Sequence, residues 1–165
     1  MAYNGLLDWD EIDGRIKRIF DHGGTFEDRM KKYLKKADIY IDDQVSVKNE
    51  DPPISGRIDF IIKHDKHEEA LLELKTIKDE DFKDLKEAPK HEHTIQLQIY
   101  LNLTDREYGV VMYENKNDQK LKAFKVDVDK QIWTDILDRC KSIMNMSEAP
   151  VQCTGMWYCK CKGER

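Results

Sequence analysis

The sequence has no long hydrophobic run, few prolines and few cysteines. Only 4 of its 165 residues are proline and 4 are cysteine. No apolar stretch reaches the ~18 residues that a membrane-spanning helix needs. The first sixteen residues are acidic and lack the basic and apolar segments of a secretory signal. These absences argue against a membrane protein and a secreted disulfide scaffold, so we expect an intracellular protein with reduced cysteines.

An excess of basic charge is also missing, because the formal net charge is -5. Nucleic-acid-binding domains are often basic. A carboxylate metal site would nevertheless add negative charge that bound cations offset. Four lysines lie at the spacing of one helix face: Lys31, Lys32, Lys35 and Lys36. They form either a phosphate-binding face or an ordinary solvated helix surface.

Apolar periodicity predicts one α/β domain with a central mixed sheet flanked by helices. Helices are expected at 10–22, 25–37, 94–103 and 130–144, and strands at 39–41, 45–47, 54–62, 70–77, 108–113 and 121–128. The charged segment 79–92 is expected to be a loop or a frayed helix. Residues 1–146 are predicted to form the domain, and 147–165 a cysteine-containing tail packed on it.

Details of two helices follow from the same pattern. Thr25 and Thr94 are candidate N-caps, since threonine can accept a hydrogen bond from a first-turn N–H. The apolar stripe of the second helix is predicted to contain Phe26, Met30, Tyr33 and Leu34. The last helix is predicted to face five apolar residues inward: Ile132, Trp133, Ile136, Leu137 and Ile143.

Two predicted strands carry charged residues among apolar ones. Asp59 lies within the first strand, and Glu73 and Lys75 lie two residues apart in the second. Side chains two apart share one face of a strand, so pairing of the two strands would let the three groups converge. Two carboxylates suit Mg²⁺ or Mn²⁺, which can activate water and offset phosphate charge. The alternative is a structural ion pair at a sheet edge.

The arrangement resembles the signature of the PD-(D/E)XK nuclease superfamily. Gly56-Arg57-Ile58-Asp59, thirteen residues, and then Glu73-Leu74-Lys75 look like G-x-x-D followed by (D/E)-x-K. The RecB-like branch adds Q-x-x-x-Y on a following helix, which Gln96–Tyr100 resembles. It also has G-x-x-(H/E) on an early helix, which Gly24–Glu27 resembles.

The resemblance implies a restriction-endonuclease-like core and a role for each matching residue. Asp59 and Glu73 would bind the metal with the Leu74 carbonyl, and Glu27 would be an outer ligand. Lys75 would be the catalytic lysine. Gln96 and Tyr100 would line the site and position the DNA backbone or the lysine. Each of these roles has an alternative. Glu27 would instead face solvent, with His22 taking its place at the site. Gln96 would be an amide on the helix surface, and Tyr100 would only pack in the core.

The function that this resemblance implies is a Mg²⁺- or Mn²⁺-dependent DNA nuclease. We expect an exonuclease or end-processing enzyme of the phage or mobile-element type, with DNA as substrate. It would act in the cytoplasm of a bacterial or phage-infected cell, with a recombination or replication protein as partner. Two alternatives stay open, namely an RNA-cutting endonuclease with the same metal site and an inactive nucleic-acid-binding scaffold.

The cysteines and histidines lie outside this signature. Some RecB-like nucleases hold an iron–sulfur cluster with one early and three late cysteines. Here the four cysteines are all late: Cys140, Cys153, Cys159 and Cys161. An iron–sulfur cluster, a zinc ion and free thiols are the three alternatives. Histidines 64, 67, 91 and 93 are expected to be solvated in charged loops.

Overall fold

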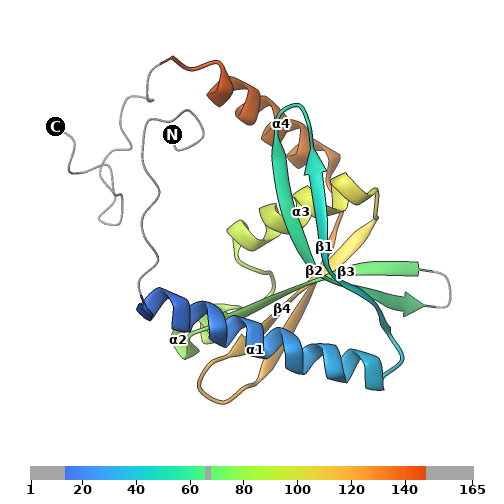
Figure 1. Cartoon of the computed structure of the whole chain (residues 1–165), viewed down its shortest axis with the longest axis vertical. Helices are drawn as coiled ribbons and strands as arrows, with labels where there is room; N and C mark the ends of the chain where they lie inside the picture. The colour runs from blue at the N-terminus through green and yellow to red at the C-terminus, as the bar shows by residue number, and fades with distance from the viewer. Residues whose placement is uncertain (1–13, 66–67, 148–165) are drawn as a thin grey trace.

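A five-stranded mixed sheet forms the centre of the protein, in a computed structural model that describes residues 14–65 and 68–147 (Figure 1). The strands are β1 (Tyr40–Asn49), β2 (Ile54–Asp65), β3 (Glu68–Ile77), β4 (Tyr108–Asn115) and β5 (Leu121–Asp127), in this order across the sheet. The helices are α1 (Gly14–Lys36), α2 (Asp79–Asp84), α3 (His91–Thr104) and α4 (Lys130–Met144).

Only β3 and β4 run parallel, and the other neighbouring strands are antiparallel. A parallel pair requires a crossover connection, which the segment containing α2 and α3 provides. The predicted β2–β3 hairpin is therefore confirmed, as is the central mixed sheet flanked by helices.

Each face of the sheet has its own core. On one face, residues of α1 pack against β2 and β3: Phe26, Met30, Leu34, Phe60, Leu72 and Leu74. On the other face, α2 and α3 pack against the sheet through Phe82, Leu85, Leu97, Tyr100 and Leu101. Leu71 and Ile77 of β3 belong to this second core. Because strand side chains alternate, Glu73 and Lys75 lie on the same face, toward α3.

Strand β2 changes partners along its length. It pairs with β1 from Ile54 to Ile62 but with β3 only from Phe60 onward. Before that point the β1–β2 hairpin turns away from β3, as Figure 1 shows. Gln44 of β1, near this turn, has a positive φ of 55°. Asp59 is consequently the last residue of β2 before the backbone pairing with β3 begins.

The prediction of two early helices is wrong, because one helix runs from Gly14 to Lys36. Gly23 and Gly24 lie inside it, although an interior glycine costs about 1 kcal/mol relative to alanine. Burial of Phe26, Met30 and Leu34 offsets that cost, since each buried large apolar side chain contributes about 1.5–3 kcal/mol. Thr25 is therefore not an N-cap, and Tyr33 is 57% exposed.

One helix begins earlier than expected, and the charged segment 79–92, expected to be a loop or a frayed helix, contains helical residues. Helix α3 begins at His91, so Thr94 lies in its first turn and its hydroxyl donates to the Lys90 carbonyl at 3.3 Å. Segment 79–92 contains the short helix α2, which forms because Phe82 is buried in the core.

Helix α4 packs less closely than predicted. None of its residues is buried, and Ile143 is exposed, while the other four apolar residues are half-buried. Within residues 14–65 and 68–147, no helix is long and apolar enough to cross a membrane.

Candidate functional site

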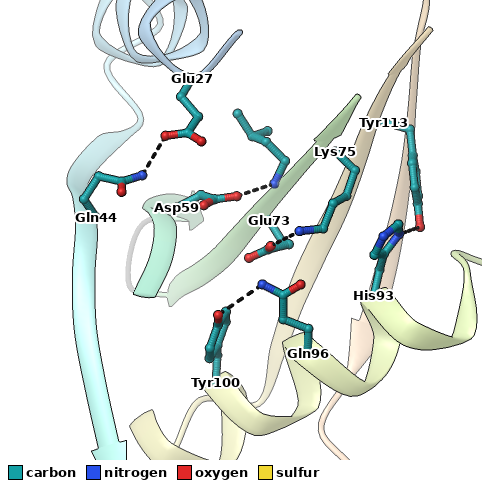
Figure 2. Close-up of polar contacts among 10 residues, drawn as sticks. Glu27, Gln44, Asp59, Glu73, Lys75, His93, Gln96, Tyr100 and Tyr113 are labelled. Atoms are coloured by element: carbon teal, nitrogen blue, oxygen red, sulfur yellow. Dashed lines mark hydrogen bonds and ion pairs between the residues drawn. The ribbon is translucent and has the colours of Figure 1, made fainter. Parts of the chain in front are cut away.

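The central feature of the site is the turn where β2 leaves β3. Asp59 Oδ2 accepts a hydrogen bond from the Leu74 N–H at 2.8 Å, so a carboxylate takes the place of a backbone partner. Lys75 Nζ donates to Glu73 Oε1 at 2.5 Å. Figure 2 shows the three charged side chains converging between α1 and α3. The convergence predicted from strand spacing is therefore present.

Glu73 is the most constrained of these groups. It is only 1% exposed, and its Oε2 atom has no hydrogen-bond partner among the residues that the structure describes. Burial, followed by the nearby Asp59 carboxylate, raises the pKa of Glu73 to about 7, although Lys75 opposes the shift. A buried carboxylate oxygen without a partner is costly, so this atom is available to an added ligand.

Asp59 responds to the same environment. Burial raises its pKa, while the Leu74 N–H and the charges of Lys75 and Arg57 oppose that rise. A cation held by Asp59 and Glu73 would stabilise the ionised form of both groups. All the donors here are carboxylate oxygens, which prefer hard divalent cations such as Mg²⁺ and Mn²⁺.

Glu27 approaches from α1, on the opposite side of the sheet. Its Oε2 accepts a hydrogen bond from Gln44 Nε2 at 2.8 Å. Burial and the Asp59 charge raise the pKa of Glu27, so the two carboxylates sense each other. Even so, no three His, Cys, Asp or Glu side chains in the described ranges lie close enough to share an ion. Carboxylates repel one another, and a cation would be needed to draw them closer.

Gln96 and Tyr100 face the carboxylates from α3. Gln96 Nε2 donates to the Tyr100 hydroxyl at 3.1 Å, which links the two residues across one helical turn. A Cβ atom on Gly56 would lie 2.5 Å from the Tyr100 ring. Gly56 therefore allows the β1–β2 hairpin to pack directly on Tyr100. Tyr100 packs in the core while its hydroxyl accepts the hydrogen bond from Gln96, and its role in positioning the DNA backbone or the lysine stays a prediction.

The site also contains a residue that the sequence analysis assigned to a solvated loop. His93 lies in α3, half-buried, with Nδ1 2.8 Å from the Tyr113 hydroxyl. Burial and then the Lys75 charge lower its pKa to about 4. The signal that could have found it is its position three residues before Gln96, on the same helix face.

Other predicted positions are less connected to this site. The Leu74 side chain packs toward α1, and the metal-binding role of its carbonyl stays a prediction. Cys140 is a free, half-buried thiol on α4, beside an apolar cavity formed with Pro52, Pro53, Ile143 and Met144. Cys153, Cys159, Cys161 and most of the predicted tail 147–165 lie outside the described residues, as does the side chain of His22.

Two of the four lysines of the predicted basic face have local partners. Lys31 Nζ lies 2.7 and 2.8 Å from the two carboxylate oxygens of Asp43. Lys35 Nζ lies 4.7 Å from the centre of the Tyr40 ring. For these two lysines the contacts favour a structural role on the helix surface.

Comparison with solved structures finds the same fold in an alkaline exonuclease and in a further protein, SSO0001. The alkaline exonuclease LHK-Exo from Laribacter hongkongensis superposes with a TM-score of 0.56 at 15% identity, over 87% of this chain and 72% of that chain. LHK-Exo in complex with dAMP gives 0.57 at 16%, with the same coverage. The structure of SSO0001 gives 0.54 at 21%, over 81% of this chain and 66% of that chain.

At these identities the likeness is one of fold. No protein-family model matches the sequence, and neither does any curated protein. The five-stranded mixed sheet flanked by helices is thus an α/β fold that this chain shares with solved exonuclease structures.

Proposed function

We propose that this protein is a metal-dependent nuclease that hydrolyses phosphodiester bonds in DNA. The proposal rests mainly on the grouping of Asp59, Glu73 and Lys75, in which one buried carboxylate oxygen of Glu73 has no hydrogen-bond partner among the described residues. A purely structural ion pair would gain little from leaving that oxygen without a partner. The fold likeness to an alkaline exonuclease supports the same reading.

The finer proposal is an exonuclease or end-processing enzyme of the phage or mobile-element type, acting in the cytoplasm. Asp59 and Glu73 would hold Mg²⁺ or Mn²⁺ with the Leu74 carbonyl, and Glu27 would contribute from outside. When bound, the cation would activate water and offset the negative charge of the phosphate.

The chain's own residues would supply the remaining chemistry. Lys75, which donates a hydrogen bond to Glu73, would stabilise the additional negative charge that develops on phosphate during attack by water. Gln96 and Tyr100, linked by their hydrogen bond, would contact the nucleic-acid backbone from α3. In the reaction a water oxygen bonds to phosphorus while the bond from phosphorus to one sugar oxygen breaks. The water gives up a proton, and the released sugar oxygen takes one up to become a hydroxyl.

The test is cleavage of labelled linear duplex DNA, circular single-stranded DNA and RNA of matched length. Each substrate is incubated with Mn²⁺, Mg²⁺, Ca²⁺ or EDTA. We expect the linear DNA to be cut with Mn²⁺ or Mg²⁺, while Ca²⁺ supports binding without turnover. Full activity in excess EDTA would contradict the proposed mechanism.

The same assay separates the alternatives. Cleavage restricted to RNA would identify an RNA-cutting endonuclease with this site. Binding of nucleic acid with no cleavage under any metal would indicate an inactive scaffold. Cutting of the circular substrate would show that a free end is not required, and would argue against a strict exonuclease.

A further inference from the structure

One face of α3 carries three polar side chains toward the carboxylate site. His93, Gln96 and Tyr100 are spaced at i, i+3 and i+7, which places them along one side of a helix. Figure 2 shows them rising from α3 on the side of Glu73 and Lys75. Gln96 and Tyr100 already have a place in the proposed function, whereas His93 does not.

The hydrogen-bond partners of His93 constrain its tautomer. The Tyr113 oxygen accepts the Lys90 N–H at 2.9 Å and lies 2.8 Å from His93 Nδ1. Tyr113 is 0% exposed, so its hydroxyl hydrogen cannot reach solvent and needs an acceptor within the protein. His93 Nδ1 is the one acceptor in contact with it among the described residues. With Nδ1 as acceptor, a neutral imidazole carries its hydrogen on Nε2.

The surroundings favour that neutral form. Burial is the main cause that lowers the pKa of His93 to about 4, and the Lys75 ammonium acts in the same direction. The ring also packs against Tyr113, with the two ring centres 5.4 Å apart. His93 is thus held by β4 on one side and senses the charge of the site on the other.

We propose that His93 Nε2–H donates a hydrogen bond to a phosphate oxygen of the nucleic-acid strand bound beside Lys75. Tyr113 is the positioning residue that holds the imidazole in the required tautomer. A neutral donor suits this place, because it binds phosphate without adding a positive charge that would repel divalent cations. This inference rests on the proposed function and adds a substrate contact to it.

Two isosteric substitutions test the two ring nitrogens separately. In His93→Asn the amide oxygen can replace Nδ1 as the acceptor for Tyr113, but nothing replaces Nε2. In His93→Gln the terminal amide can replace the Nε2 donor, while the acceptor for Tyr113 is lost. We expect His93→Asn to fold like the wild type and to lose about tenfold to a hundredfold in kcat/KM, the range for one hydrogen bond to a charged group.

His93→Gln should melt at a lower temperature yet keep more kcat/KM than His93→Asn. A purely structural role for His93 predicts the reverse order of activities, and that result would overturn the proposal. Tyr113→Phe should reduce kcat/KM less than His93→Asn does. It no longer fixes the tautomer of His93, but the imidazole that can donate from Nε2 is still present.

Two measurements do not depend on turnover. Nitrogen NMR of the wild-type imidazole should show hydrogen on Nε2, and hydrogen on Nδ1 would overturn the proposal. Fluorescence anisotropy with a labelled single-stranded oligonucleotide in Ca²⁺ should show weaker binding for His93→Asn than for the wild type.

A wild type that binds and cuts DNA while His93→Asn is unaffected refutes only the role of His93. A wild type that neither binds nor cuts nucleic acid refutes the proposed function, and this inference with it.

Discussion

Two buried acidic side chains lie on adjacent strands of the sheet and differ in how completely their oxygens are paired. Glu114 on β4 is 5% exposed and forms an ion pair with Arg29, which extends from α1. Its neighbour Asn115 donates to Asp79 at 2.8 Å and accepts from the Asn117 N–H at 3.0 Å. Polar groups in this part of the sheet have their partners within the protein.

Glu73 on β3 is buried more deeply but is only half satisfied. One carboxylate oxygen meets Lys75 and the other has no partner in the described chain, while Asp59 adds a second negative charge nearby. The difference teaches that burial of an acid is not itself a sign of function. The sign is burial with an incomplete set of partners, because that arrangement costs stability unless a ligand completes it.

The largest effect expected from this comparison is on cleavage. Lys75→Ala and Asp59→Ala should each lower kcat by at least about 10²–10³-fold, the usual cost of removing one electrostatic contributor to a transition state. Circular dichroism should show both variants folded. Undiminished cleavage by folded Lys75→Ala would break the assignment of this region as the catalytic one.

The matched substitution in the other region should affect stability instead. Glu114→Ala leaves the partly exposed Arg29 without this partner, and we expect the free energy of unfolding to fall by about 1–3 kcal/mol, the usual cost of removing one partner of a hydrogen bond to a charged group. Urea denaturation measures this change. The rate of cleavage per folded molecule should stay at the wild-type level. A large loss of kcat would contradict the assignment of Glu114 to a structural role and of Glu73 to the catalytic site.

The third prediction concerns pH. The pKa of Glu73 is raised from 4.5 to about 7 in the folded protein. The folded state therefore keeps a proton that the unfolded state has already released, and stability falls as pH rises through this window. In metal-free protein the free energy of unfolding should decrease by about 2 kcal/mol between pH 5.5 and pH 7.5.

Glu73→Gln is the control for this prediction, since an amide does not titrate. It should flatten much of the pH dependence and should make the metal-free protein more stable than the wild type at pH 7.5, while abolishing cleavage. The raised pKa of Asp59 adds a slope of the same sign in both proteins. Equal pH slopes for the wild type and Glu73→Gln would show that the burial of Glu73 carries no such cost.

The smallest effect is expected at the edge of the site. Glu27→Gln should shift the metal dependence of cleavage to higher concentration by about tenfold, with partial rescue at high Mn²⁺, as loss of an outer partner of a metal site does. Its free energy of unfolding should change by under about 0.5 kcal/mol. A superimposable metal titration would identify Glu27 as an ordinary helix residue bonded to Gln44.

The strands and the late helices were largely predictable because their signals are local. The alternation of side chains along β3 predicted that Glu73 and Lys75 share one face, whatever strands β3 pairs with. The four-residue spacing of Gln96 and Tyr100 likewise predicted that they share one face of α3. The prediction of two early helices was wrong for a local reason too. Gly23 and Gly24 read as a break, but helix propensity is a weak signal that the burial of the apolar stripe overrides.

Other parts of the site depended on contacts between distant segments. His93 was predicted to be solvated because no neighbouring residue in the sequence indicates its contact with Tyr113, which lies 20 positions away on β4. Likewise, no pattern in β1 indicates that Gln44 bonds to Glu27, 17 residues earlier on α1.

The sequence by itself determined which residues bear charge inside apolar strands and which side chains share a face, because side-chain direction follows the period of each element. Only the tertiary structure decided where β2 parts from β3. That separation leaves the Leu74 N–H to the carboxylate of Asp59, and the packing around it buries one oxygen of Glu73 that has no partner in the part of the chain that the structure describes. Strand pairing and its interruption arise from packing across the whole sheet, and no single segment of the chain encodes them.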